Sequence, residues 1–253
     1  MTSDNREAVA VGGYLGLAGV RTWTVEVTGV ADITPRMRRV ELTASDLDAL
    51  EYLPGQDLML IFPQAEGRPV HRRYTIRRFD VARRLLELNF VMHGDGPAAR
   101  WAQVAEPGVR IEVAGPRGKI TLAPDADWHL FAGDATGLPV SQAMMEAVPP
   151  GSSALAFISV DGPEEEQPAP GMSWLHADQE GGEAASALGR ALAAAELPAG
   201  RGHAYLAGEV GLVTELKGIL IERGLAGEQV SAKGYWKSGR ANASHGEPES
   251  RVG

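Results

Sequence analysis

The chain has 253 residues, and its 24 Lys and Arg against 33 Asp and Glu give a formal charge of −9. This balance argues against a general nucleic-acid binder or a protein held at an anionic membrane, because affinity for phosphates depends mainly on a basic surface. The absence of cysteine excludes disulfides, zinc–thiolate sites, a nucleophilic thiol and a Cys-ligated iron–sulfur cluster.

The first half of the chain is predicted to be mainly β-structure. Thr22–Val30 begins with a strict alternation of polar and apolar residues, which is typical of a half-buried strand. Further strands are predicted at Met37–Leu42, Asp57–Phe62, Val70–Phe79, Arg84–Met92 and Arg110–Val113. Short strands separated by turns at this spacing favour a small antiparallel barrel.

The second half has a different periodicity. Apolar strands are predicted at Trp128–Ala132, Ala154–Val160 and His203–Ala207, and helices at Pro139–Val148, at Ser186–Leu197 and around Leu212–Leu220. Strands that alternate with helices indicate a doubly wound parallel sheet covered on both faces. Gly162–Gly171 and Asp178–Glu183 are expected to be surface loops. The predicted organisation is therefore a β-barrel domain over 18–123, an α/β domain over 124–240 that includes a C-terminal segment, and a flexible tail over 241–253.

No apolar run approaches the length of a transmembrane helix, and Ala8–Val20 lacks the basic start and strong apolar centre of a signal peptide. A cytoplasmic location is therefore expected. The histidines show no metal-ligand spacing, so no metal site is predicted.

An arginine-rich segment is the strongest local feature of the sequence. Arg68–Arg84 holds seven arginines and a single acidic residue. On a strand, Arg72, Tyr74 and Ile76 would point to one face and Thr75 to the other. A guanidinium beside an aromatic ring suits a ligand with a phosphate at one end and a flat ring at the other. The alternative is an edge strand that its charges protect from aggregation.

The segment His93–Ala102 contains a predicted helix start. Pro97 suits the first position of a helix, and Gly96 allows a ligand to approach the backbone. The free N–H groups at such a helix start form an anion site, although an ordinary strand-to-helix turn would have the same sequence. Together with the arginine-rich strand, this helix start favours a diphosphate ligand.

These two motifs carry a resemblance to a known family. Arg72-x-Tyr74-Thr75 followed by Gly96-Pro97-Ala98-x-x-Trp101-Ala102 resembles the siderophore-interacting proteins, which are FAD-containing ferric-siderophore reductases of the ferredoxin–NADP reductase superfamily. Gly133-Asp134-Ala135-Thr136-Gly137-Leu138-Pro139 and Gly234-Tyr235-Trp236-Lys237-x-Gly239-Arg240 are also similar to this family. The resemblance implies that the barrel binds FAD and that the α/β domain binds NADH or NADPH.

The resemblance also implies roles for individual residues. The cofactor-binding residues that it implies are Arg72, Tyr74, Thr75, Ile76, His93, Gly96, Pro97, Ala98, Trp101, Gly133, Asp134, Thr136, Gly208, Glu209, Tyr235 and Trp236. Tyr74 and Thr75 would lie against the isoalloxazine and are the implied catalytic residues. Lys233, Lys237 and Arg240 would form a cationic wall for anionic ferric siderophores; the alternative is a solvated terminal helix or strand with scattered lysines.

The function that the resemblance implies is electron transfer from NAD(P)H through FAD to chelated Fe(III), with release of Fe(II) in the cytoplasm. The implied partners are a ferric siderophore and, as a further possible donor, ferredoxin; neither nucleic acid nor membrane is expected, and a monomer is assumed. One alternative is an NAD(P)H–flavin oxidoreductase that serves a protein electron acceptor. Others are a non-catalytic flavin-containing siderophore-binding protein and a flavin-free carrier.

Overall fold

The computed structural model of the chain describes residues 20–63, 69–92, 94, 96–176 and 184–238. The chain divides into two compact units, residues 1–121 and 122–253.

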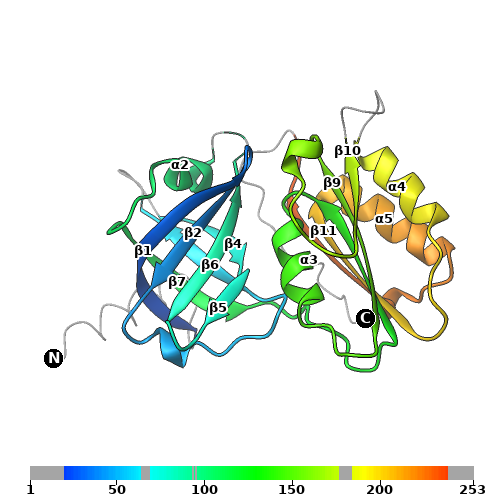
Figure 1. The fold of residues 1–253 in the computed structure, drawn as a ribbon, viewed down its shortest axis with the longest axis horizontal. Helices are drawn as coiled ribbons and strands as arrows, with labels where there is room; N and C mark the ends of the chain where they lie inside the picture. The colour runs from blue at the N-terminus through cyan, green and yellow to red at the C-terminus, as the bar shows by residue number, and fades with distance from the viewer. Residues whose placement is uncertain (1–19, 64–68, 93, 95, 177–183, 239–253) are drawn as a thin grey trace. The chain divides into compact units, whose positions relative to one another are not determined.

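The first unit contains a seven-stranded antiparallel sheet, a short α-helix and a 3₁₀ turn (Figure 1). Its elements are β1 (Arg21–Thr34), β2 (Met37–Thr43), η1 (Leu47–Ala49), β3 (Asp57–Phe62), β4 (Val70–Thr75), β5 (Arg78–Asp80), β6 (Leu85–Val91), α2 (Pro97–Val104) and β7 (Arg110–Arg117). The strand order is β4-β3-β7-β1-β2-β6-β5, so the two outermost strands are consecutive in the chain. Since only two residues join these edge strands, the sheet must curl back on itself, which confirms the predicted barrel.

The single strand predicted over Val70–Phe79 is wrong. The backbone N–H of Ile76 donates to the carbonyl of Gln56 at 3.0 Å, whereas the N–H of Arg77 donates to the carbonyl of Glu87, also at 3.0 Å. The chain therefore leaves the β3 side at Thr75 and joins β6 at Arg78, which divides the predicted strand into β4 and β5.

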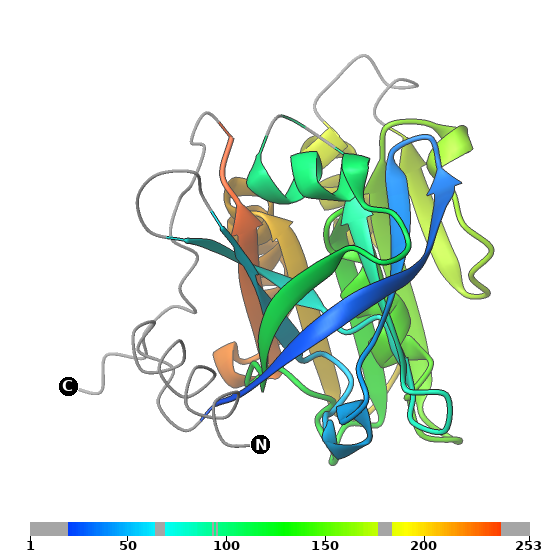
Figure 2. The ribbon, with the colours of Figure 1, turned by 90° about the vertical axis from the view of Figure 1, so that its left-hand side faces the viewer.

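The core of the first unit is formed by the alternate side chains of these strands. Val40, Leu58, Leu88 and Phe90 are completely buried within it. The helix α2 packs against the same core through Ala98 and Ala102, and Figures 1 and 2 show this helix beside the ends of the barrel strands. The position of α2 therefore depends on contacts with the barrel, as expected for a helix too short to be stable alone.

The second unit is a five-stranded parallel sheet with helices on both faces, as the sequence predicts (Figure 1). Its elements are β8 (Trp128–Asp134), α3 (Leu138–Met145), β9 (Ser153–Val160), η2 (Pro163–Glu165), β10 (Met172–His176), α4 (Ala184–Ala194), β11 (Gly202–Glu209), α5 (Val210–Glu222), η3 (Gly227–Gln229) and β12 (Val230–Trp236). The strand order is β10-β9-β8-β11-β12. Leu130, Leu206, Leu188 and Leu216 pack in one core cluster between the sheet and the helices α4 and α5.

The strands β10 and β12 were not among the predicted elements. Both lack a continuous apolar run, since β12 contains Lys233 and Gly234 and β10 contains Ser173. The predicted surface loop over Gly162–Gly171 is also partly wrong, because Glu165 and Gln167 are buried. The other predicted loop, Asp178–Glu183, lies outside the described residues.

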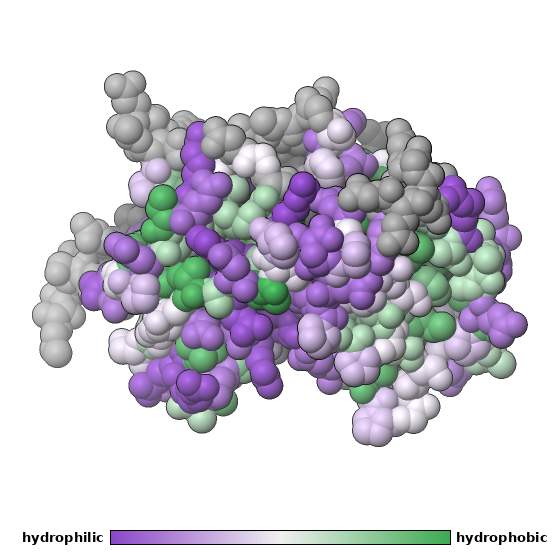
Figure 3. All heavy atoms as spheres, turned by 45° about the horizontal axis from the view of Figure 1, so that its top comes forward, coloured by the Kyte–Doolittle hydropathy of each residue, from purple (hydrophilic) through white to green (hydrophobic). Residues whose placement is uncertain are grey.

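Hydrophilic and hydrophobic residues are interspersed on the face of the molecule that Figure 3 shows. Among the described residues, the large hydrophobic side chains that remain exposed come from separate parts of the chain: Leu53, Val81, Val104 and Ile221. Within the described ranges, no helix combines the length and the apolar character needed to cross a membrane.

Candidate functional site

The arginine-rich strand β4 lies at one end of the strand order of the barrel. Arg72 is opposite Leu60 and Tyr74 is opposite Leu58 in the ladder with β3. Both leucines are completely buried, so the strand directs Arg72 and Tyr74 toward the inner side of the barrel. Ile76 is fully buried in the same core, and its backbone N–H donates to the carbonyl of Gln56, so the structure gives no support to a direct contact of Ile76 with a ligand.

A chain of aromatic contacts connects β4 with α2. The ring of Tyr74 lies 4.2 Å from that of Phe90, and the ring of Phe90 lies 5.5 Å from that of Trp101 in α2 (centroid distances). Trp101 also meets Phe62 edge-on at 6.0 Å, and Phe62 is the ladder partner of Val70. Phe90 and Trp101 therefore connect Tyr74 of β4 with α2 through the barrel core.

The hydroxyl of Tyr74 stays protonated at neutral pH. Burial raises the pKa of Tyr74, and the opposing effect of the nearby Arg72 charge is smaller. Tyr74 can therefore act as a hydrogen-bond donor or a packing surface, but not as a base.

The start of α2 has the features of an anion site. The N-cap is Gly96 and Pro97 occupies the first turn, and no side chain among the described residues caps this end. A Cβ added to Gly96 would meet no described atom within 4 Å, so the space beside this residue is open. The first N–H groups of a helix have no partner within the helix and attract negative charge. Together with Arg72, this helix start fits a diphosphate; His93 lies outside the described residues.

The neighbouring arginine has a different role. The Nε of Arg73 lies 2.6 Å from Oδ1 of Asp57, whose side chain is almost completely buried. Thr75 is the ladder partner of Asp57 and is itself buried. Arg73 and Thr75 thus lie on the other side of β4 from Arg72, and Arg73 neutralises a buried carboxylate of the unit. The sequence pattern alone does not distinguish Arg73 from the other arginines of this segment.

In the second unit, Asp134 joins the carboxyl ends of three strands. One carboxylate oxygen accepts hydrogen bonds from the backbone N–H of Thr136 at 2.8 Å and from its hydroxyl at 2.5 Å. The other accepts from the backbone N–H of Glu209 at 2.7 Å and from the indole Nε1 of Trp236 at 3.0 Å. Since β8, β11 and β12 end at these residues, the carboxylate fixes the strand ends and the orientation of the Trp236 side chain.

The glycines beside Asp134 allow the strands and α3 to approach closely. A Cβ on Gly133 or Gly137 would overlap the carbonyl oxygen of Ala207. Gly208 has a φ of +150°, and a Cβ there would lie 2.7 Å from Oδ2 of Asp134. Packing therefore requires glycine at these three positions, with or without a ligand.

Glu209 is the N-cap of α5. Its carboxylate accepts hydrogen bonds from the backbone N–H groups of Gly211 and Leu212 and, at 3.1 Å, from that of Ser238. Burial opposes the ionisation of Glu209, but these backbone hydrogen bonds and the charge of Lys237 outweigh it, so the pKa of Glu209 lies below its ordinary value of 4.5. The capping role of Glu209 and the contribution of Ser238 were missed, because no helix-start motif precedes Val210 in the sequence.

We expect Glu209→Gln to destabilise the second unit by roughly 1 kcal/mol at neutral pH and by less in acid. Because the folded pKa of Glu209 is lowered, its contribution is present above the unfolded pKa and is lost as the pH falls through the folded value. Urea unfolding of both proteins from about pH 7 to about pH 3 measures this difference. Glu222→Gln, at the other end of α5, is the control that should show no such loss at neutral pH. A difference between Glu209→Gln and the native protein that stays constant with pH would contradict the assignment.

The predicted cationic residues do not form a uniform group. Lys233 is 7% exposed, and its Nζ lies 5.5 Å from the centroid of the Tyr235 ring, a cation–π distance. Lys237 is exposed and acts on the Glu209 carboxylate. Arg240 lies outside the described residues. Lys233 and Lys237 therefore have different surroundings, although they are close in sequence.

Comparison with known proteins gives matches over most of the chain. Residues 126–239 match the sequence model of the siderophore-interacting protein family, and residues 61–120 match the siderophore-interacting FAD-binding domain. Ferric vibriobactin reductase ViuB of Vibrio cholerae is 31% identical over 238 residues, covering 82% of this chain and 86% of the relative. The NADPH-dependent ferric-chelate reductase of Escherichia coli is 28% identical over 185 residues, covering 70% of each chain. The crystal structure of a siderophore utilization protein from T. fusca has a TM-score of 0.80 and 34% identity, covering 89% of this chain and 96% of that one.

Proposed function

Because the chain belongs to the siderophore-interacting protein family, we propose that it is an FAD-dependent ferric-siderophore reductase that uses NADH or NADPH. The observation that carries this proposal lies within the part that matches the FAD-binding domain, residues 61–120. There, the rings of Tyr74, Phe90 and Trp101 connect the strand that contains Arg72 with α2, and no described side chain caps the start of this helix.

Arg72 and the backbone N–H groups at the start of α2 would hold the FAD diphosphate. A guanidinium and helix N–H groups both favour dianionic phosphates. Tyr74 would orient the flavin ring through its side chain. Thr75 is buried on the other side of β4, at the end of the strand, so it would approach the flavin through its backbone. Trp101 would maintain the position of α2 through its contacts with Phe62 and Phe90.

Bound FAD supplies the chemistry that links a two-electron nicotinamide donor to a one-electron ferric acceptor. The protein contributes binding, orientation and local charge. Neither Tyr74, whose raised pKa keeps it neutral, nor Thr75 has to move a proton.

The nicotinamide cofactor would bind at the carboxyl ends of β8 and β11, where ligands of parallel sheets commonly lie. The carboxylates of Asp134 and Glu209 are engaged within the unit. We therefore propose that they shape this edge of the sheet, and that the backbone at Gly133–Thr136 and Gly208–Glu209 lines the cofactor. The E. coli relative is named as NADPH-dependent, which makes NADPH one of the two donors to test.

The ferric siderophore would be attracted by Lys233, Lys237 and Arg240. Fe(III) prefers hard oxygen ligands, and its reduction weakens their hold, so the reaction would release the metal. We expect this release to take place in the cytoplasm.

The proposal is tested by anaerobic assays of the FAD-loaded protein with several ferric siderophores and each nicotinamide, in which a ferrous-specific dye detects Fe(II). The expected result is turnover with at least one siderophore that depends on both FAD and a nicotinamide. Reduction of a carrier protein such as ferredoxin, but of no ferric chelate, would instead favour a reductase with a protein acceptor. Tight siderophore binding without turnover would exclude a reductase and favour a non-catalytic siderophore-binding protein.

A further inference from the structure

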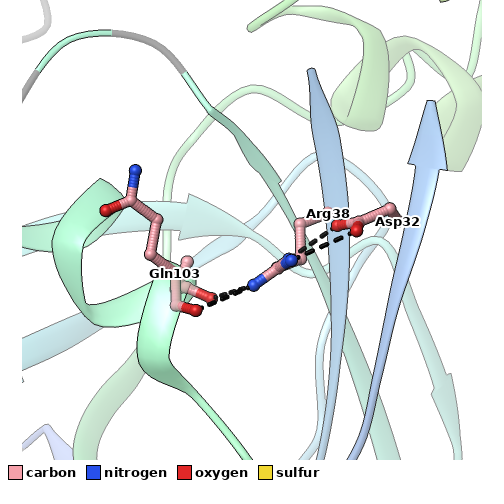
Figure 4. A network of polar contacts seen from close by, with 4 residues as sticks. Asp32, Arg38 and Gln103 are labelled. Carbon is pink, nitrogen blue, oxygen red and sulfur yellow. Dashed lines mark hydrogen bonds and ion pairs between the residues drawn. The ribbon is translucent and has the colours of Figure 1, made fainter. Parts of the chain in front are cut away.

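Arg38 connects the β1–β2 hairpin with the last turn of α2 (Figure 4). Its Nε and Nη2 donate to the two carboxylate oxygens of Asp32 at 2.7 and 3.1 Å. Its Nη1 donates to the backbone carbonyls of Ala102 and Gln103, both at 3.0 Å. All three nitrogens of the guanidinium thus donate hydrogen bonds, two of them to the β1–β2 hairpin and the third to the end of α2.

These contacts provide hydrogen-bond donors for the last carbonyl groups of α2. The last carbonyls of a helix have no N–H partner within it, and their end of the helix carries partial negative charge. Arg38 supplies both hydrogen-bond donors and a positive charge to this end. A helix of eight residues, Pro97–Val104, depends on such external contacts for its stability and position.

Asp32 holds the guanidinium in the required orientation. Asp32 and Arg38 are ladder partners in β1 and β2, so the carboxylate is placed by the sheet itself. Two parallel N–H···O bonds fix the plane of a guanidinium in a way that a single contact does not. The hydrogen bonds from Arg38 also lower the pKa of Asp32, so this carboxyl stays ionised further into acid than an ordinary aspartate.

We propose that Arg38 is a positioning residue for FAD: by holding the C-terminal turn of α2 against the β1–β2 hairpin, it sets the place of the helix start that receives the diphosphate. This inference rests on the proposed function for its ligand, but the anchoring of α2 is a property of the protein alone. Arg38 touches the far end of the helix and need not touch FAD.

Arg38→Ala and Arg38→Lys test the proposal, with Arg110→Ala as the matched control. Arg110 forms a similar ion pair with Glu26 across β7 and β1, at 2.9 Å, so this pair joins two strands rather than a strand and α2. Two quantities are measured: the dissociation constant for FAD, and hydrogen exchange in the FAD-free protein of peptides that cover residues 97–105.

We expect Arg38→Ala to weaken FAD binding about tenfold and to accelerate exchange in α2, while exchange in the barrel strands is unchanged. Arg38→Lys keeps the charge but loses the paired contact with Asp32, so it should restore part of the affinity. Arg110→Ala should behave as the native protein in both measurements. If Arg38→Ala does not fold, Asp32→Asn, which loosens the guanidinium without removing it, is expected to give the same changes to a smaller extent.

Native FAD affinity and native α2 exchange in Arg38→Ala would overturn the proposal, as would an equal loss of affinity in Arg110→Ala. If the native protein itself binds no FAD, the proposed function fails. Exchange in the FAD-free variants would still show whether Arg38 anchors α2.

Discussion

Replacing Arg72 with alanine is expected to raise the dissociation constant for FAD by about 10- to 100-fold, because charge-assisted hydrogen bonds to phosphate contribute roughly 1.5–3 kcal/mol. The unfolding temperature of the FAD-free protein should change little, since Arg72 is half-buried in an edge strand and the packing of Tyr74 and Ile76 against the core stays in place. Affinity for riboflavin, which has no phosphate, should be unaffected. Fluorescence titration with both flavins measures this difference.

The adjacent Arg73→Ala is the matched control and should show the opposite behaviour. Removal of Arg73 takes away the charged partner of the almost fully buried Asp57. We expect this loss to destabilise the first unit by about 2–3 kcal/mol, with riboflavin and FAD affected equally. An Arg72→Ala variant that retains native affinity for FAD would exclude Arg72 from the diphosphate site.

Gly133→Ala is expected to destabilise the second unit by about 3–5 kcal/mol. The added Cβ would overlap the carbonyl oxygen of Ala207, and its nearest neighbours are all backbone atoms of Ala207, so no flexible side chain can move away. Since Gly133 and Ala207 are ladder partners in β8 and β11, relief of the overlap requires separation of two central strands. Urea unfolding followed by circular dichroism detects the loss.

Gly218→Ala is the control for this prediction. Gly218 lies exposed in α5, where a Cβ would meet no described atom within 4 Å. Alanine is a better helix former than glycine, so this change should be neutral or stabilising by about 0.5–1 kcal/mol. Equal stability of Gly133→Ala and Gly218→Ala would show that the strands can separate at Gly133 without cost.

The sequence predicts the architecture well because the periodicity of apolar residues reports which side of each element is buried. Asp57–Phe62 has the predicted bounds as a buried strand. The division at Thr75 was not predictable, since it depends on which strands lie beside Ile76 and Arg77 rather than on local pattern. The strand β12 was missed because it contains Lys233, which a hydropathy pattern assigns to the surface. In the structure Lys233 is buried and lies against the ring of Tyr235.

The candidate site was predictable only as a set of motifs. Arg72, Tyr74 and the start of α2 come from sequence patterns with direct physical meaning. The roles of Asp134 and Arg38 depend on partners far away in the chain: Trp236 for Asp134, and Ala102 and Gln103 for Arg38. Such contacts cannot be inferred from one sequence: Asp134 was predicted only as a cofactor-binding residue, and no role was predicted for Arg38.

Anaerobic rapid mixing of the FAD-loaded protein, first with NADH or NADPH and then with a ferric siderophore, tests the proposed function most directly. The visible absorbance of the bound FAD should disappear on the first mixing and return on the second, while a ferrous-specific dye records the released iron. A flavin spectrum that neither nicotinamide changes, or whose bleaching no ferric siderophore reverses, would contradict the assignment as a ferric-siderophore reductase.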